Sequence, residues 1–444
     1  MRSYKKIMPF LLTLALLGSV VYSFQNRGEE RREYEDALTQ ARLYASKGIE
    51  KDAMEQYQAA LALEPSLQLY LEAGEVYFSN NDRRGAESWY ETLLSNYPKE
   101  AGTYYYGLRA SAMREDYTQL FSIYEDYQKR NLHTDEVEAF VKDYQYTYSL
   151  TGVYEDVGVF GTSSGLAAAK YSDRWGYVDA KGNRKVSYSF EAAGMFGDYA
   201  PAITRDGRAI YIDMSGAEKI NEAFILEKDP DFGSVTEFRN IYGNLILAYN
   251  GAEWNYYSFD TFEKRVGGFA DALPVANGIG AVSRDGLTWA LINDDGTLLT
   301  DFSYDEILAD QKEIVYRGDA LLAKLDGMYI LINSQGQQIG SNHYTDAKPF
   351  YETTYAAVEK GGKWLFVDST GEEHDLGNFE EAESFSCGLA AVKRDGKWGY
   401  IDSSGEMVIE NVFYEAGPFG NQGACFVKVA QNQWQLLRLY RFQT

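Results

Sequence analysis

Cysteine and histidine are scarce in this sequence of 444 residues. The two cysteines are Cys387 and Cys425, and the three histidines are His133, His343 and His374. They form no Cys-x-x-Cys or His-x-x-x-His pair, the spacings that zinc sites commonly use. We therefore expect no structural metal site. The sequence leaves open whether the two cysteines form a disulfide, which an exported location would permit.

Basic residues are also under-represented. Lysine and arginine number 42 against 66 aspartates and glutamates, which gives a net charge of −24. A chain this acidic repels phosphate backbones, so we expect no nucleic-acid partner. The sequence lacks a Gly-rich phosphate loop and a nucleophile elbow, and no pair of carboxylates stands out as catalytic. These absences predict a protein with no cofactor and no catalytic centre.

A long uncharged stretch lies close to the N-terminus. Arg2, Lys5 and Lys6 form a basic segment over residues 1–6, residues 7–24 carry no charge, and a polar linker follows over residues 25–33. The stretch is at the lower limit for a membrane-spanning helix. Basic residues before it favour a cytoplasmic N-terminus. We predict a single-pass signal anchor with extracytoplasmic C-terminal domains; the alternative is a signal peptide cleaved after Ser23 and a secreted protein.

Residues 34–150 have apolar residues at helical spacing, and the pattern repeats. Small and aromatic positions recur at a constant interval, because small residues let two helices approach while aromatic rings fill the space between helix pairs. The first copy contains Ala41, Tyr44, Ala53, Tyr57, Ala60 and Pro65; the second contains Gly74, Tyr77, Ala86, Tyr90, Leu93 and Pro98; a weaker third keeps Leu108, Leu120, Tyr124 and Tyr127.

This pattern resembles the tetratricopeptide (TPR) repeat. We expect turns between helices at Gly48 and Gly85, and a final helix from Thr134 to Tyr148 that covers the open end of the stack. The resemblance implies a concave face lined by the first helix of each pair. Because protein or peptide segments bind there in the family, we expect a groove; the alternative is a simple spacer. The positions carried over are Leu38, Arg42, Leu71, Glu75, Phe78, Tyr105 and Arg109.

Residues 151–444 change to short alternating strands separated by glycine turns. Asp-Gly pairs such as Asp395-Gly396 predict hairpins. Six of the seven tryptophans head the same strand of a unit that recurs about eight times, so we expect them to pack between units; the alternative is a set of platforms for sugar rings. These residues are Trp175, Trp254, Trp289, Trp364, Trp398 and Trp434.

The clearest copies are Trp175 to Asp179 and Trp398 to Asp402, which resemble the WG repeat family. The resemblance implies a repetitive β-architecture that binds other molecules. Repeats of this length form a propeller or an open β-solenoid. The segment from Tyr154 to Phe160 is similar to the end of a repeat, and the C-terminus stops soon after the strand of Trp434. We therefore predict a closed propeller of seven or eight blades, each with three main strands and a short or irregular fourth.

The predicted fold is thus an α + β multidomain chain: a transmembrane helix, a TPR-like α-solenoid and an all-β WG-repeat domain. We predict a membrane-anchored extracytoplasmic scaffold that binds a protein or peptide partner and has no catalytic activity. One alternative is a propeller that binds cell-wall polysaccharide. A propeller hydrolase is the other.

Overall fold

The computed structural model of the protein describes residues 28–443, which divide into two compact units between Thr147 and Tyr148. The predicted basic segment and signal anchor, residues 1–24, lie outside the described residues. Among the helices that are described, none combines the length and apolar character needed to cross a bilayer. Residues 28–33, which we assigned to a linker, are already helical. Glutamate and arginine are good helix formers, and Arg31 pairs with Glu35 one turn later at 3.2 Å.

The first unit is a series of helix pairs. Ser66, Asp82 and Asp116 cap three of its helices by accepting a hydrogen bond from a backbone N–H of the first turn. The first helices of the three pairs are residues 28–46, α3 (Leu67–Ser79) and α5 (Ala101–Met113). The helices after residues 28–46 are α2 (Glu50–Leu63), α3 (Leu67–Ser79), α4 (Arg83–Asn96), α5 (Ala101–Met113), α6 (Tyr117–Lys129) and α7 (Asp135–Lys142).

Glycines in this unit let aromatic rings approach the backbone. A Cβ on Gly74 would lie 2.3 Å from the ring of Tyr106, as the alternation of small and large residues predicts. Gly48 has a φ of 69° in the turn before α2, which confirms its predicted role. Gly85 lies inside α4, so its predicted turn is wrong. A Cβ there would come within 2.2 Å of Tyr77, so close helix packing explains this glycine.

The final helix is shorter than predicted. The Thr134 hydroxyl accepts a hydrogen bond from the Val137 N–H at 3.4 Å, so the predicted cap is confirmed. The helix ends at Lys142, however, and Tyr148 begins a β-strand that pairs with Leu439. Pairing in the second unit therefore overrides helix formation, and the boundary lies at residue 148 instead of 151.

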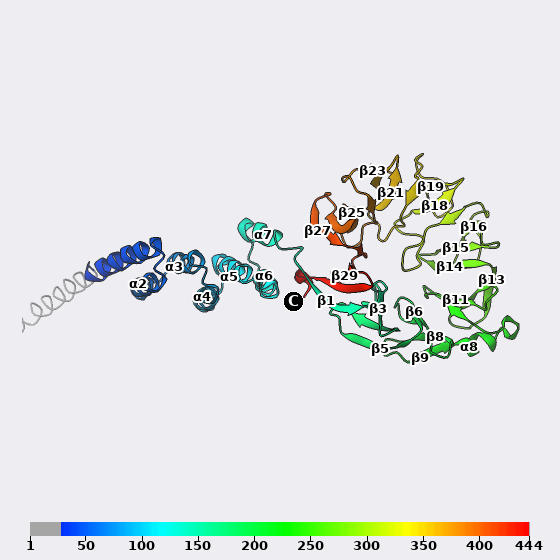
Figure 1. Ribbon diagram of the computed structural model, residues 1–444, viewed down its shortest axis with the longest axis horizontal. Helices are drawn as coiled ribbons and strands as arrows, with labels where there is room; N and C mark the ends of the chain where they lie inside the picture. The colour runs from blue at the N-terminus through cyan, green and yellow to red at the C-terminus, as the bar shows by residue number, and fades with distance from the viewer. Residues whose placement is uncertain (1–27, 444) are drawn as a thin grey trace, which may run out of the picture. The chain divides into compact units, whose positions relative to one another are not determined.

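The second unit is an eight-bladed β-propeller (Figure 1). Six sheets have four strands and two have three, and neighbouring strands within each sheet are antiparallel. The first four blades are β2 (Asp156–Val157), β3 (Leu166–Tyr171), β4 (Arg174–Asp179) and β5 (Arg184–Phe190); β6 (Ala192–Ala193), β7 (Ala200–Ile203), β8 (Ala209–Ile212) and β9 (Glu218–Asn221); β10 (Glu237–Phe238), β11 (Leu245–Tyr249), β12 (Trp254–Ser258) and β13 (Lys264–Phe269); and β14 (Asp271–Ala276), β15 (Ile279–Ser283) and β16 (Trp289–Asn293).

The remaining blades follow the same order from the inside outwards. They are β17 (Glu306–Ile307), β18 (Leu321–Leu325) and β19 (Met328–Ile332); β20 (Asp346–Ala347), β21 (Ala356–Lys360), β22 (Lys363–Val367) and β23 (Glu373–His374); β24 (Glu381–Ala382), β25 (Leu389–Arg394), β26 (Lys397–Asp402) and β27 (Met407–Phe413); and β28 (Glu415–Ala416), β29 (Ala424–Ala430), β30 (Gln433–Leu439) and β1 (Tyr148–Tyr154).

The short or irregular fourth strand is confirmed at both edges of the blades. Most innermost strands contain two residues. In the fourth and fifth blades the outermost strand is replaced by isolated β-bridges, such as the one between Trp289 and Tyr304. An insertion precedes the third blade and explains the longer interval before Trp254. It contains the helix α8 (Glu222–Leu226) and the 3-10 helix η1 (Pro230–Phe232).

The ring is closed by its two ends. Strand β1 pairs with β30 as the outer strand of the eighth blade, with Tyr154 opposite Trp434. Closure is therefore confirmed, and the open β-solenoid is wrong. The closing strand nevertheless lies upstream of the segment that we predicted. Most of the segment from Tyr154 to Phe160 belongs to the first blade, because Asp156 pairs with Lys170 of β3.

Candidate functional site

The seven residues predicted to line the concave face all lie on the first helices of the helical unit. Two bidentate ion pairs join these helices. The Arg42 guanidinium donates to both carboxylate oxygens of Glu72 at 2.6 and 2.9 Å, and Arg109 donates to those of Glu75 at 2.5 and 2.9 Å. The hydrogen bond from Arg42 lowers the pKa of Glu72 although burial opposes it. Arg109 and Glu75 of the predicted set thus compensate each other's charge, whereas Arg42 pairs with Glu72, which was not predicted.

The C-terminal end of this surface is filled by the chain itself. The Arg109 guanidinium lies 4.1 Å from the ring centroid of Phe78 and 5.7 Å from that of Tyr105. Tyr105 in turn packs edge-on against Phe140 of α7, with 5.6 Å between the centroids. The covering role of the final helix is therefore visible at the third helix pair. Four of the predicted residues form what we call the exposed strip: the exposed Arg42 and Glu75, and the half-buried Leu38 and Leu71.

In the propeller, each predicted tryptophan belongs to a row of residues that lie opposite one another across the strands of a blade. In the seventh blade, Glu381 lies opposite Lys393, Lys393 opposite Trp398, and Trp398 opposite Phe413. We call this arrangement the acid–lysine–aromatic row. Three other blades repeat it, as Asp156, Lys170, Trp175 and Phe190; Glu306, Lys324, Tyr329 and Tyr344; and Glu415, Lys428, Trp434 and Tyr154.

The row explains the recurring tryptophan. Trp254, Trp364 and Trp398 are only 4 to 7% exposed, as expected for residues that pack between blades. The ammonium groups of Lys393 and Lys428 lie 5.9 and 5.4 Å from the ring centroids of Trp398 and Trp434. The acid and the lysine of the row were not among the predicted site residues. The available signal was a lysine at a nearly constant distance before the aromatic residue.

A cavity of about 650 Å³ lies among the innermost strands of the seventh, eighth and first blades. Its aromatic lining includes the partly buried Trp434 and the exposed Tyr414, which is 54% accessible. Its charged lining consists of Glu381, Glu383, Glu415 and Lys393. The volume is within the range of roughly 300–1,000 Å³ that small-molecule sites occupy. The cavity is therefore a candidate binding site.

The carboxylates of this cavity have cationic or hydroxyl partners. Glu381 lies 3.5 Å from Lys393 and 3.7 Å from Lys348, and Glu415 forms an ion pair of 2.5 Å with Lys428. Glu383 has two partners. It lies 3.3 Å from Lys348 and accepts a hydrogen bond of 2.5 Å from the hydroxyl of Tyr351.

These contacts shift the pKa values of the partners. Burial lowers the pKa of Lys348, but Glu383 and Glu381 outweigh it, so the pKa is raised. Burial, and then the charge of Glu383, raise the pKa of Tyr351 well above its ordinary value. Lys348 therefore stays charged and Tyr351 stays protonated at neutral pH. The cavity wall consists of matched donors and acceptors.

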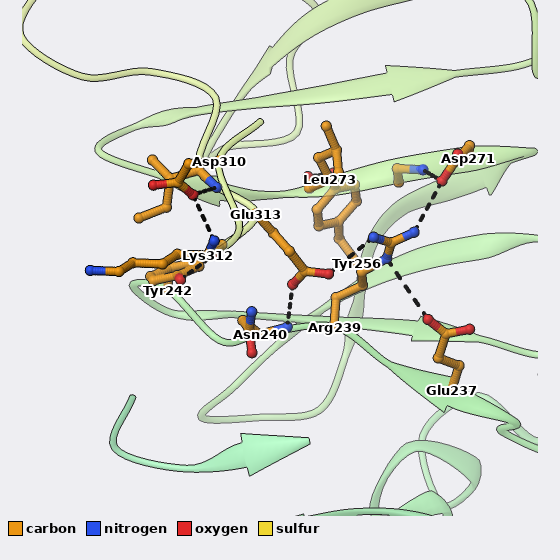
Figure 2. Close-up of polar contacts among 12 residues, drawn as sticks. Glu237, Arg239, Asn240, Tyr242, Tyr256, Asp271, Leu273, Asp310, Lys312 and Glu313 are labelled. Atoms are coloured by element: carbon orange, nitrogen blue, oxygen red, sulfur yellow. Dashed lines mark hydrogen bonds and ion pairs between the residues drawn. The ribbon is translucent and has the colours of Figure 1, made fainter. Parts of the chain in front are cut away.

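A loop of the fifth blade, residues 308–317, contacts the first and third blades, and we call it the finger. Figure 2 shows Asp310, Lys312 and Glu313 of this loop. The Lys312 Nζ donates to the Thr162 hydroxyl of the first blade, which stands opposite the fifth, at 2.9 Å. Tyr242 of the third blade donates its hydroxyl to the Lys312 carbonyl at 2.5 Å. Inside the finger, the Asp310 side chain is 2% exposed and pairs with Arg317 at 2.7 Å. Contacts with two distant blades therefore fix the finger across the ring.

Arg239 anchors the finger from the third blade (Figure 2). Its guanidinium lies 3.0 Å from Glu313 of the finger, 3.5 Å from Asp271 and 4.0 Å from Glu237. It also lies 4.9 Å from the ring centroid of Trp254. Burial lowers the pKa of Arg239, but the three carboxylates outweigh burial and raise it. One cation is thus shared by three carboxylates, which outnumber it.

The comparison with known families agrees with the repeat that these rows define. Residues 331–364, 377–398 and 398–434 match the WG containing repeat, and each segment ends at a tryptophan of the predicted set. The C-terminal region carries WG repeats. No curated protein matches the chain. Among solved structures, the crystal structure of the computationally designed Ika8 protein is 11% identical with a TM-score of 0.42, and the match covers 63% of this chain and 96% of that one.

The aspartates of the WG repeats stabilise turns. Asp402 accepts hydrogen bonds at Oδ1 from the backbone N–H groups of Ser404 and Glu406, and Asp368 accepts the equivalent pair. Within residues 28–443, the single group of metal-type ligands is Asp368, Glu372 and His374, and it occupies this same turn. The turn hydrogen bonds account for the position of Asp368, and the His374 Nε2 lies 3.7 Å from its carboxylate.

Both cysteines of the WG-repeat region are free thiols in the structure. The Cys425 sulfur lies 3.2 Å from the hydroxyl of Tyr400 in the core, and burial raises the pKa of this thiol. Burial, together with the nearby charge of Glu352, raises the pKa of Cys387 to about 11. The structure therefore gives no support to a disulfide, and neither thiol is an activated nucleophile.

Proposed function

We propose that this protein is a membrane-anchored extracytoplasmic scaffold that binds a protein or peptide partner through its helical unit and catalyses no reaction. The observation that carries this proposal is the exposed strip, in which Leu38 and Leu71 lie beside the ion-paired Arg42 and Glu75. A surface that alternates apolar and charged side chains on successive helices suits an amphipathic segment. The basic residues before the uncharged stretch support the anchored and exported location.

The carboxylates of the propeller support binding over catalysis. Asp156 and Glu306 hold the same row position as Glu381 and Glu415 but lie outside the lining of the cavity. A residue that recurs where there is no cavity is explained by the architecture of the blade.

The experiment that tests the exposed strip compares two arginines of the same helix. Arg42 and Arg31 each pair with a glutamate, and their side chains are 58% and 75% exposed, but only Arg42 belongs to the strip. Crosslinked pulldowns from membranes should recover a partner with the wild type and with Arg31→Ala, and lose it with Arg42→Ala. Equal recovery with both variants would contradict the proposal. Digestion of the C-terminal units by protease added to intact cells would test their location.

A carbohydrate-binding propeller is the second candidate function. The observation that favours it is the cavity of about 650 Å³, whose lining combines Tyr414 and Trp434 with Lys393 and carboxylates that pair with lysines. Aromatic rings beside fixed polar groups are a general means of holding a sugar, because the ring covers the C–H face while the polar groups bind the hydroxyls.

A further inference from the structure

We infer that the cavity among the seventh, eighth and first blades binds an uncharged oligosaccharide segment. The inference rests on the second candidate function and is independent of the exposed strip. Three features of the cavity favour such a ligand: the paired charges of the wall, the aromatic residues of the wall, and the finger.

The charges of the wall balance. Three glutamates and Lys393 line the cavity, and these glutamates pair at 2.5 to 3.7 Å with Lys393 and with Lys348 and Lys428, which are not part of the lining. A cationic ligand would have to compete with these lysines for the carboxylates, and an anionic ligand would meet three carboxylates. An uncharged polyol avoids both costs, because each hydroxyl can donate to a carboxylate and accept from an ammonium group. The pairing therefore favours a neutral ligand.

The aromatic residues offer surfaces for sugar rings. Tyr414 is 54% exposed, and Lys397 covers one face of its ring with its ammonium group 3.0 Å from the centroid. Trp434, which is partly buried, also lines the cavity and belongs to the eighth blade. The C–H face of a pyranose ring is apolar, so packing it on an aromatic ring removes apolar surface from water. The cavity volume of about 650 Å³ suits a short oligosaccharide.

The finger supplies an uncharged polar group to the cavity. Gln311 lies at its tip and lines the cavity. The Gln311 amide is exposed and has no hydrogen-bond partner among residues 28–443, whereas its neighbours Asp310 and Lys312 are fixed by the contacts described above. A primary amide offers two donors and one acceptor without charge, which matches sugar hydroxyls or an acetamido group. The finger thus places at the cavity an amide whose hydrogen-bonding groups are free to bind a ligand.

The test is calorimetric titration of the purified full chain with trisaccharides of different charge. The neutral probes are the N-acetylglucosamine trimer (triacetylchitotriose), cellotriose, xylotriose and maltotriose. The cationic probe is the glucosamine trimer, which has the same backbone as triacetylchitotriose, and the anionic probe is trigalacturonate. We expect at least one neutral trisaccharide to bind, and both charged trimers to bind more weakly. Failure of all four neutral probes, or tighter binding of a charged trimer, would overturn the inference.

Matched variants place the binding in this cavity. Tyr414→Ala should weaken the neutral ligand by at least about tenfold, and Gln311→Ala by roughly two- to tenfold. The control is Tyr171→Ala, because Tyr171 is 53% exposed and lies outside the cavity lining. Wild-type affinity in both cavity variants, or an equal loss with Tyr171→Ala, would refute the assignment. Since partner recovery through Arg42 is measured separately, failure here leaves the scaffold proposal intact.

Discussion

Tyr154 of β1 lies directly opposite Trp434 of β30, although the two residues stand at opposite ends of the propeller sequence. Around this pair, Phe426 and Leu436 form a buried cluster with residues of the first blade such as Val178. The eighth blade therefore consists of both ends of the unit. Because either end alone leaves an unpaired strand and an uncovered apolar face, the integrity of the whole ring depends on this one junction.

Removing the last strand tests that dependence. We expect deletion of residues 433–444 to lower the melting temperature of the whole β-unit strongly or to cause aggregation. In an open array the same deletion would remove about one interface and leave the other repeats folded. Circular dichroism of the full and truncated chains measures the difference. A truncated protein that melts almost like the intact chain would contradict a junction that holds the ring together.

Two leucines separate core packing from exposure. Leu436 of β30 is fully buried, whereas Leu287 in a hairpin turn is 74% exposed. We expect Leu436→Ala to lower the free energy of unfolding by about 2–5 kcal/mol, because it leaves a cavity between the eighth and first blades. Leu287→Ala should change it by no more than about 0.5 kcal/mol. Chemical denaturation of the two variants decides; similar values for both would mean that the blade interface contributes little.

The fold was largely predictable because repetition averages out local ambiguity. A single copy such as Trp175 to Asp179 indicates only a strand, but eight copies with Asp-Gly turns predict a ring of blades. Details that depend on one contact were not predictable. Gly85 is an example, because its proximity to Tyr77 follows from how two helices pack and not from its place in the repeat.

The candidate site was less predictable than the fold. Strand pairing brings Glu381 beside Lys393, but a sequence without known registers does not show which acid faces which lysine. The finger was missed for a similar reason. Its contact from Lys312 to Thr162 joins opposite sides of the ring, and only the closed ring brings those two residues together.

The two thiols give a prediction on pH. Because the pKa of Cys387 is about 11, we expect its alkylation by iodoacetamide in the native protein to accelerate roughly tenfold per pH unit between pH 8 and pH 10, where an ordinary thiol levels off. The raised pKa also means that the protonated thiol stabilises the fold below about pH 9 and that this contribution is lost as the pH rises through 11. Mass spectrometry measures the rate for each cysteine.

The control for this experiment is the buried Cys425, which should stay unmodified in the native state at every pH of the series. After denaturation without a reducing agent, both thiols should react. A rate for Cys387 that is already constant at pH 9 would show that its environment does not suppress ionisation. No reactive thiol after denaturation would show a disulfide instead.

The finger yields the last prediction, because the group around Arg239 contains one cation and three carboxylates. Glu313→Gln keeps the size of the side chain and leaves Arg239 paired with Asp271, so we expect a loss of about 1 kcal/mol in the free energy of unfolding. Arg239→Met leaves Glu313, Asp271 and Glu237 close together without a counter-charge, so we expect a larger loss of about 3 kcal/mol.

Chemical denaturation measures both losses, and the exposed Glu410 supplies the control Glu410→Gln, which should change the stability by less than about 0.5 kcal/mol. In the double variant the two losses should not add, because Glu313→Gln removes one of the carboxylates that Arg239→Met leaves unpaired. If Glu313→Gln alone were as costly as Arg239→Met, the finger would depend on the hydrogen bond from the Asn240 N–H to Glu313 at 2.9 Å, and not on the charge of Arg239. The order of the two losses therefore distinguishes a charge-held finger from one held by backbone hydrogen bonding.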